Sequence, residues 1–102
     1  TFTFAYNCRL CVKSLKKTIS NIEDGKQLIK ASGSVGANYI EANEKLGNKD
    51  FIFRLKIARK EAKESKYWLR LLYALNEDDK TLKNLINEAE EIKKNTIIYY
   101  VK

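Results

Sequence analysis

The sequence predicts an all-α fold, an antiparallel up-and-down four-helix bundle, and three observations support that prediction. Apolar residues recur at helical spacing along four separate segments. The 102 residues include no proline, which inside a helix costs about 3 kcal/mol, and all four glycines fall between Gly25 and Gly47. The connections between the segments are short, as they are between antiparallel helices. Residues 1–102 are therefore expected to form one domain.

The first helix is expected to run from Phe4 to about Asn21. Its apolar face steps by four and three residues through Phe4, Cys8, Cys11, Leu15, Ile19 and Ile22. Its opposite side is basic and carries Arg9, Lys13, Lys16 and Lys17. The stretch from Asn21 to Gly25 is typical of a short turn, with Asp24 as the expected N-cap of the following helix.

Cys8 and Cys11 form a C-x-x-C pair, a spacing found in redox pairs and in halves of zinc sites. Structural zinc takes four ligands, and the chain has no histidine and no further cysteine. A thioredoxin-like site needs a βαβ setting that the sequence does not predict. Both thiols fall on the apolar face of the first helix, so we expect them to pack as small buried hydrophobes without a metal.

The second helix is expected from Gly25 to Leu46, although a run of small residues from Ala31 to Ala37 interrupts its apolar pattern. Interior glycines cost about 1 kcal/mol each, so this segment could break into two short helices. Small side chains also let a neighbouring helix approach closely, and we expect one continuous helix. A phosphate-binding loop is disfavoured, because no GKS or GKT follows and no strand precedes the run. Gly47 is expected to end the helix in the left-handed C′ position, and Asn48 to cap the next one.

The third helix, residues 49–75, has the strongest pattern. Its apolar stripe consists of Phe51, Leu55, Ala58, Ala62, Ser65, Leu69 and Leu72. A second set is expected to widen the buried face near both ends: Phe53, Ile57, Trp68, Leu71 and Leu75. Beside the stripe, basic residues repeat at steps of three and four and form one ridge: Lys56, Arg59, Lys63, Lys66 and Arg70. From Lys49 to Arg70 there are eight basic and three acidic residues, so most of the chain's net charge of +7 lies on this helix.

The fourth helix follows the acidic capping segment from Asn76 to Asp79. Its apolar set comprises Leu82, Leu85, Ile86, Ala89, Ile92, Thr96, Ile97 and Tyr100. No internal repeat or low-complexity tract is visible. No run of about 18 apolar residues exists and no signal peptide is recognisable, so we expect no membrane partner and a cytoplasmic location.

Four motifs give the chain a family resemblance. They are Gln27-Leu28, SVGANYIEA at 34–42, KDF at 49–51 and IARKEAKESKYWL at 57–69. In this order they resemble the small bacterial four-helix-bundle family named after 23S rRNA intervening sequences, and the resemblance runs from about Phe4 to Tyr100. The family often has a proline soon after the first helix and another before Ala-Asn; Lys17 and Gly36 occupy those places here.

The resemblance implies a bundle that assembles as a ring, commonly a homopentamer, with no established enzymatic activity. The chain is also similar to accessory proteins of diversity-generating retroelements. Those are basic pentameric bundles that bind nucleic acid and a reverse transcriptase. This similarity implies RNA or DNA, and a protein such as a reverse transcriptase, as partners.

Two functions are compatible with the residues. A pI near 9.4 favours anionic partners, so the leading hypothesis is a non-catalytic oligomer that binds RNA or DNA through the ridge, with Arg9, Lys13, Lys16 and Lys17 contributing. The competing interpretation is a solvated ridge paired with Glu61, Glu64 and the acidic last helix.

The alternative function is a protein-interaction scaffold. Its interface is expected among aromatic residues beyond the needs of the core: Phe51, Phe53, Tyr67, Trp68, Tyr99 and Tyr100.

An enzyme is the weakest hypothesis. Without histidine, the di-iron bundle site with its Glu-x-x-His pairs and the Ser-His or Cys-His nucleophile schemes are all excluded. Glu41 and Glu44 lie three residues apart and could form a carboxylate site, but pairing with lysines is the more common use of such residues. We therefore expect no catalytic residue, no metal and no cofactor.

Overall fold

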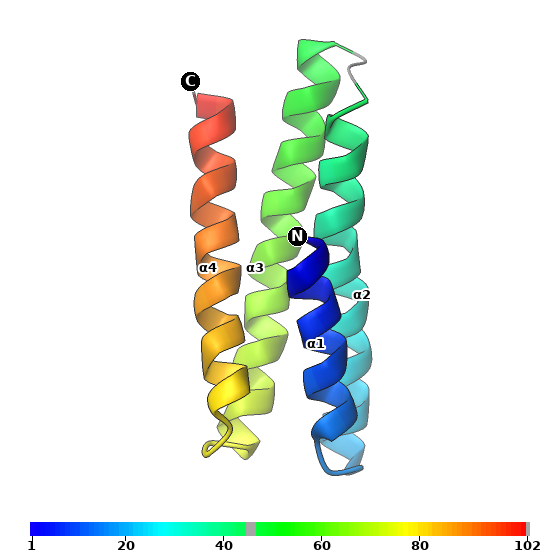
Figure 1. The fold of residues 1–102 in the computed structure, drawn as a ribbon, viewed down its shortest axis with the longest axis vertical. Coiled ribbons are helices and arrows are strands. Elements are labelled where there is room, and N and C mark those ends of the chain that lie inside the picture. The colour runs from blue at the N-terminus through cyan, green and yellow to red at the C-terminus, as the bar shows by residue number, and fades with distance from the viewer. Residues whose placement is uncertain (45–46, 102) are drawn as a thin grey trace.

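The computed structural model describes the backbone of residues 1–44 and 47–101, and side chains through Thr96 within those ranges. Four helices form the bundle: α1 (Phe2–Ser14), α2 (Ile19–Ala42), α3 (Asn48–Leu75) and α4 (Lys80–Val101). They run alternately up and down and form a rod with extents of 44 × 19 × 18 Å (Figure 1). The expected all-α up-and-down bundle is confirmed. No helix among the described residues is long and apolar enough to cross a membrane.

The four helices differ in length, and α1 is the short one. Figure 1 shows α1 lying along the lower half of α2, with the N-terminus near mid-height, whereas α2, α3 and α4 continue upward. The main core cluster is built where all four helices are present. Its buried residues are Phe4, Cys8, Cys11, Leu15, Leu28, Leu69, Leu72, Leu82, Leu85 and Ala89. The upper half is thus held by three helices.

A hydrogen bond joins α2 to α4. The Thr96 hydroxyl donates to the Ile92 carbonyl at 2.7 Å, so it is available to accept from the Tyr39 hydroxyl, also at 2.7 Å. Thr96 is fully buried, so its polar group needs both partners.

The first helix ends earlier than the sequence pattern predicts. It stops at Ser14, and α2 begins at Ile19, because the Thr18 hydroxyl accepts a hydrogen bond from the Asn21 N–H at 3.1 Å and caps α2. The predicted turn from Asn21 to Gly25, with Asp24 as cap, is therefore wrong, since these residues lie inside α2. Ile19 and Ile22 are exposed and belong to α2, not to the core face of α1. Lys16 and Lys17 lie in the connection.

Asn21 is buried because it joins the lower ends of two helices. Its Nδ2 donates to the Lys16 carbonyl at 3.1 Å, and its Oδ1 accepts from Asn76 Nδ2 at 3.0 Å. Asn76 also donates to the Leu72 carbonyl at 2.7 Å at the end of α3. These bonds satisfy polar groups that would otherwise be costly to bury.

The small residues of α2 let α1 approach closely, and the expected continuous helix is confirmed. A Cβ placed on Gly25 would lie 2.8 Å from Val12 Cγ1. A Cβ on Gly36 would meet only Thr1, at an ordinary 3.6 Å. The close approach therefore depends on Gly25 far more than on Gly36.

A pair of substitutions tests this packing. Gly36→Ala is expected to raise the free energy of unfolding by about 0.5–1 kcal/mol, because alanine favours helix and restricts the unfolded chain. Gly25→Ala is expected to lower it by about 1–3 kcal/mol, because the stiff Val12 side chain must move. Urea denaturation measures both, and equal stabilisation by the two changes would contradict the close contact.

The predicted stripe of α3 is largely confirmed, and its predicted widening is partly wrong. Leu55, Ala58, Ala62, Ser65, Leu69 and Leu72 are buried, and Phe51 is half-buried. Of the second set, Ile57 and Trp68 are half-buried, but Phe53, Leu71 and Leu75 are exposed. These three point to the outer flank of α3, because neighbouring helices cover only one side of it.

The ends of α2, α3 and α4 show how these helices are capped. Gly47 has φ 115° and is the N-cap of α3, not the C′ residue of α2, which ends at Ala42. Leu46 lies outside the described residues. Asp79 Oδ1 accepts from the Leu82 N–H at 3.0 Å, which confirms an acidic cap for α4. The predicted core positions Leu82, Leu85, Ala89 and Thr96 are buried, while Ile97 and Tyr100 lie outside the described side chains.

Candidate nucleic-acid interface

Four basic side chains gather in the middle of α3. Lys56, Arg59, Lys60 and Lys63 line a shallow hollow of about 520 Å³, and Glu64 is the one acidic residue among its described lining. The steps of three and four residues place these side chains on neighbouring turns of one helix surface. We name these four basic residues the α3 basic patch.

Three of the four patch residues form no ion pair within the described part of the protein. Arg59, Lys60 and Lys63 form no ion pair with any residue that the structure describes. Lys60 and Lys63 are exposed, and Arg59 is half-buried. The patch therefore presents a concentrated positive charge to a solvent-accessible hollow.

Lys66 belongs to a different environment, although it continues the ridge in sequence. Its Nζ lies 2.8 Å from Glu90 Oε1 on α4, and Lys93 Nζ lies 3.1 Å from Glu90 Oε2. Arg70, the last residue of the ridge, is exposed. The predicted ridge is thus divided into three parts. Lys56, Arg59 and Lys63 belong to the α3 basic patch, Lys66 forms an ion pair with Glu90 of α4, and Arg70 is exposed further along α3.

The two neighbouring lysines, Lys66 and Lys93, strongly lower the pKa of Glu90. Hydrogen bonds from Lys66 and then Lys93 lower the pKa of Glu90 from its ordinary value of 4.5 to about 2. A carboxyl group whose pKa is depressed in the folded state stabilises the fold above its unfolded pKa, and that contribution is lost as the pH falls toward the folded pKa. The relevant window therefore lies between about pH 4.5 and pH 2.

Replacing Lys66 should weaken this pH dependence. Between about pH 5 and pH 2.5, wild type is expected to lose more free energy of unfolding than Lys66→Met, because the variant keeps only Lys93 beside Glu90. Urea denaturation across that range measures the difference. Lys26→Met, which removes an exposed pair with Glu23, is the control and should retain the wild-type slope. Identical slopes for wild type and Lys66→Met would contradict this account.

The expected pairing of the ridge with acidic residues is seen between Lys66 and Glu90 of α4, whereas, among the described side chains, Glu61 and Glu64 form no ion pair with Arg59 or Lys63. Burial, and then the neighbouring Glu64 carboxylate, raise the pKa of Glu61, while a hydrogen bond from Ser34 on α2 lowers it. The positive charge of Lys60, a member of the α3 basic patch, also lowers the pKa of Glu61, so this carboxylate interacts with both α2 and the patch. Glu41 and Glu44 are exposed and form no ion pair with a described residue, so the expected lysine pairing is not seen there.

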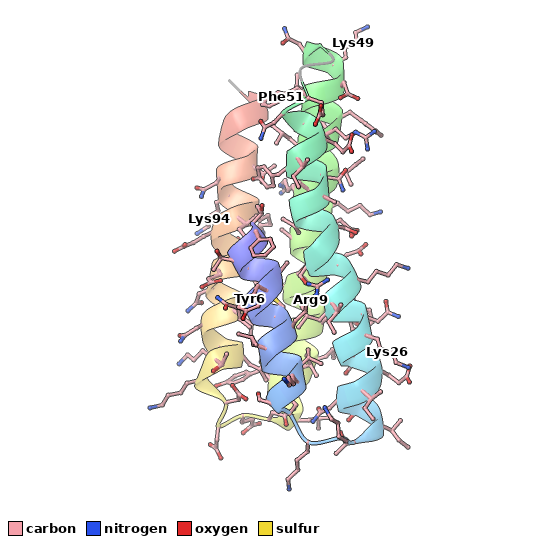
Figure 2. All side chains as sticks on the ribbon, turned by 45° about the vertical axis from the view of Figure 1, so that its right-hand side comes forward. Tyr6, Arg9, Lys26, Lys49, Phe51 and Lys94 are labelled. Carbon is pink, nitrogen blue, oxygen red and sulfur yellow. The ribbon has the colours of Figure 1, made fainter. Side chains whose placement is uncertain are left out.

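The basic residues of the first segment lie apart from the α3 basic patch. Arg9 lies between α1 and α2, where its guanidinium donates to the carbonyls of Ala5 at 2.9 Å and Ile29 at 3.4 Å (Figure 2). Lys13, at the end of α1, and Lys16 and Lys17, in the connection to α2, are exposed, whereas the patch lies in the middle of α3. The structure does not bring the two basic groups into one surface.

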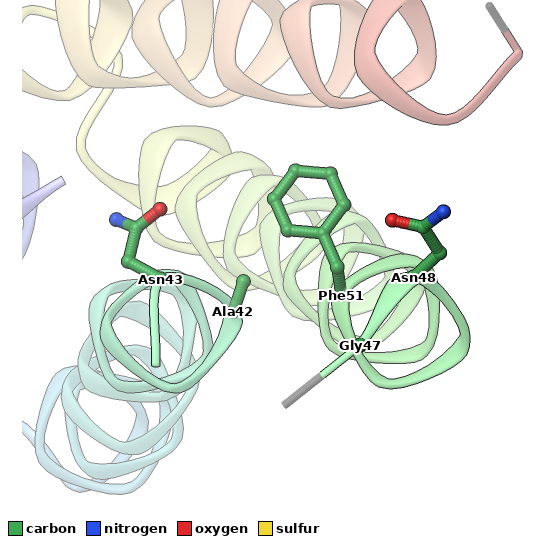
Figure 3. A pocket seen from close by; sticks show the side chains of 5 residues that line it. All are labelled: Ala42, Asn43, Gly47, Asn48 and Phe51. Atoms are coloured by element: carbon green, nitrogen blue, oxygen red, sulfur yellow. The ribbon is translucent and has the colours of Figure 1, made fainter. Parts of the chain in front are cut away.

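The candidate interface aromatics also divide into two groups. Phe53 and Tyr67 are 56% and 57% exposed on α3. Trp68 is half-buried and meets Tyr67 edge to face, with ring centroids 5.0 Å apart. Phe51 is half-buried and lines an open pocket with Ala42 at the upper end of the bundle (Figure 3). Tyr99 and Tyr100 lie outside the described side chains.

Sequence reasoning missed an apolar groove between α1 and α2. Its volume is about 530 Å³, and Phe2, Tyr6 and Ile40 on its walls are all exposed. The signal was present, because Phe2, Tyr6 and Leu10 repeat at intervals of four on the side of α1 opposite the core stripe.

The C-x-x-C pair is packed inside the bundle, as expected. Cys8 and Cys11 are both buried free thiols. Burial raises the pKa of Cys8 to about 12 and that of Cys11 to about 11, so both stay protonated near neutral pH. Within the part of the chain that the structure describes, no cluster of three or more histidine, cysteine or acidic residues could hold a metal ion.

The fold and its patch define a small basic four-helix-bundle protein. A family model described as "23S rRNA-intervening sequence protein" matches residues 1–97. The chain belongs to the 23S rRNA-intervening sequence protein family.

A solved relative shares the fold over nearly its whole length. It is a protein of unknown function from the S23 ribosomal protein family of Bacteroides thetaiotaomicron VPI-5482, and it is 31% identical in sequence. The match covers 96% of this chain and 92% of that chain, with a TM-score of 0.82. No functionally curated protein gives a significant match.

Proposed function

We propose that this protein is a non-catalytic module that binds the phosphate backbone of RNA or DNA through the α3 basic patch. One observation carries the proposal. Arg59, Lys60 and Lys63 surround one hollow and have no ion pair with a described residue, whereas the neighbouring Lys66 is taken up by Glu90. Cations that form no ion pair with a described carboxylate are suited to an anionic partner.

The geometry suits phosphates better than base edges. Lys56 and Lys63 are separated by two helical turns, about 10 Å along the axis, and the patch follows one helix surface. Lysine and arginine contacts to phosphates release condensed counterions and carry no sequence information by themselves. Binding is therefore expected to be strongly salt-dependent and tolerant of sequence.

A salt series tests the proposal directly. A fluorescently labelled RNA duplex and a DNA duplex of the same sequence are titrated with the protein at several salt concentrations. Four phosphate contacts per chain predict a slope of log affinity against log salt of about −3 to −4, and a steeper slope if several chains bind together. An affinity independent of salt, or no binding at low salt, would contradict the proposal.

A second candidate function is self-association with a protein-scaffold role, as the family resemblance to ring-forming pentamers implies. The observation that favours it is the exposure of large aromatic residues on two faces, Phe53 and Tyr67 on α3 and Phe2 and Tyr6 on α1. Aromatic residues are enriched at interface centres, and two different faces are what a ring of identical chains requires. A ring would repeat the α3 basic patch and so strengthen weak contacts. A reverse transcriptase is a candidate protein partner on the same resemblance.

Self-association has its own test. Light scattering after size exclusion is expected to give a mass several times the 11.8 kDa of one chain, with five chains as the favoured number. The double change Phe53→Ser, Tyr67→Ser is expected to shift the distribution toward smaller species, because it removes aromatic contact area. Lys30→Ser is the exposed control. A monomer at micromolar concentration would end this proposal.

A further inference from the structure

Arg59 differs from the other cations of the α3 basic patch. Its Nε is buried and has no hydrogen-bond partner, and no described residue forms an ion pair with its guanidinium. Buried donors in native proteins are nearly always satisfied, so an unsatisfied one needs an explanation. The half-buried side chain also lines the hollow beside Lys60 and Lys63.

Two other side chains provide internal comparisons. Arg54 also has a buried Nε without a hydrogen bond, but that atom lies 3.8 Å from Asp50 Oδ1, so a carboxylate compensates its charge. Lys66 is compensated by Glu90 at 2.8 Å. Arg59 has a buried Nε as Arg54 does, but no described carboxylate lies within ion-pair distance of it.

We propose that Arg59 anchors a single phosphate group in this hollow, with Lys60 and Lys63 as flanking cations. This inference rests on the proposed function and deepens it, because it replaces a diffuse positive surface by one defined phosphate site. The ligand class is a phosphate ester, either a backbone phosphodiester or a free polyphosphate. A guanidinium carries several N–H donors in one plane, and two of them can match two phosphate oxygens as a lysine cannot.

The chemistry of the walls supports a phosphate over an apolar ligand. Among the described lining residues, four are cationic and the one acidic residue is Glu64. A phosphate accepting from the guanidinium of Arg59 would compensate a charge that no described carboxylate pairs. By contrast, the exposed Lys13, Lys16 and Lys17 have no buried donor.

The distinguishing experiment changes geometry while keeping charge. Arg59→Lys and the reciprocal control Lys63→Arg are titrated with the labelled RNA duplex over a salt series. Arg59→Lys is expected to bind about 10-fold more weakly at every salt concentration with an unchanged salt slope, because the number of cations is the same. Lys63→Arg is expected to bind within about twofold of wild type. Arg59→Gln should both weaken binding and reduce the slope by about 1.

The outcomes separate this inference from the proposed function. If wild type binds with a steep slope and Arg59→Lys binds equally well, the defined site is wrong and the diffuse surface stands. If wild type binds neither duplex but binds sodium tripolyphosphate, and the Arg59 variants bind it more weakly, the site is a free-polyphosphate site and the proposed function is wrong. Competition by polyglutamate as strong as by tripolyphosphate at equal charge would overturn the phosphate assignment. Circular dichroism and thermal unfolding of each variant establish that it is folded.

Discussion

Reversing three charges of the α3 basic patch is expected to weaken RNA duplex binding by at least about 100-fold at moderate salt. The triple variant carries Arg59→Glu, Lys60→Glu and Lys63→Glu. It loses three phosphate contacts, and it adds three carboxylates that repel the phosphates. The α3 helix should persist, since these side chains form no ion pair with a described residue whose loss would destabilise it.

A matched control separates the patch from net charge. The control variant carries Lys30→Glu, Lys80→Glu and Lys83→Glu, all at exposed positions on α2 and α4. Each reversal removes two units of charge, so both triple variants have a formal net charge of +1 in place of +7. The control is expected to lose less than about 10-fold, because long-range attraction is screened within about 10 Å. Equal losses in the two variants would show that overall charge, and not the patch, determines binding.

The largest expected effect on stability comes from the core of α2. Leu28 is fully buried in the main cluster, and Leu28→Ala is expected to lower the free energy of unfolding by about 2–5 kcal/mol. The cost combines the lost burial of the side chain with the cavity left among close-packed neighbours. Urea denaturation followed by circular dichroism measures it, at one fixed protein concentration.

Ile19 supplies the comparison on the same helix. It is 85% exposed, so Ile19→Ala is expected to change the free energy of unfolding by less than about 0.5 kcal/mol. If Ile19→Ala were as costly as Leu28→Ala, Ile19 would belong to the core, and the observed boundary between α1 and α2 would be wrong.

That boundary shows what periodicity alone could not determine. Ile19 and Ile22 continue the steps of four and three begun by Phe4, so the apolar pattern extends across the actual connection by coincidence. The decisive signal is local, since Thr18 caps α2 three residues before Asn21. Asparagine is common in turns, and nothing in the sequence indicates that Asn21 is buried, because its hydrogen-bond partner Asn76 lies 55 positions away.

The buried residues of α3 could be predicted only where helical spacing alone places them on one face. The narrow stripe from Leu55 to Leu72 was correct because six positions at steps of three and four must share one face. Phe53, Leu71 and Leu75 were misplaced because the width of a buried face depends on how many helices surround it. Among the described residues α3 lies directly beside α2 and α4 but not beside α1, so its outer flank stays open along its whole length.

The candidate site was predicted in outline and refined by contacts between helices. The ridge on α3 is visible in the sequence, but the capture of Lys66 by Glu90 is not, since the two residues are 24 positions apart on different helices. Lys60 was absent from the predicted ridge because it lies one step off its spacing, yet it lines the same hollow as Arg59. The unsatisfied Nε of Arg59 could be found only from the structure.

Lysine footprinting can locate bound RNA on the protein surface. The protein is acetylated briefly with and without a saturating RNA duplex at low salt, and mass spectrometry gives the modification rate of each lysine. Bound RNA is expected to slow modification of Lys56, Lys60 and Lys63 at least about fivefold, because phosphates screen and cover these amines. Lys30, Lys80 and Lys83 should react at unchanged rates. Protection confined to Lys13, Lys16 and Lys17, or equal protection of all lysines, would contradict an interface on α3.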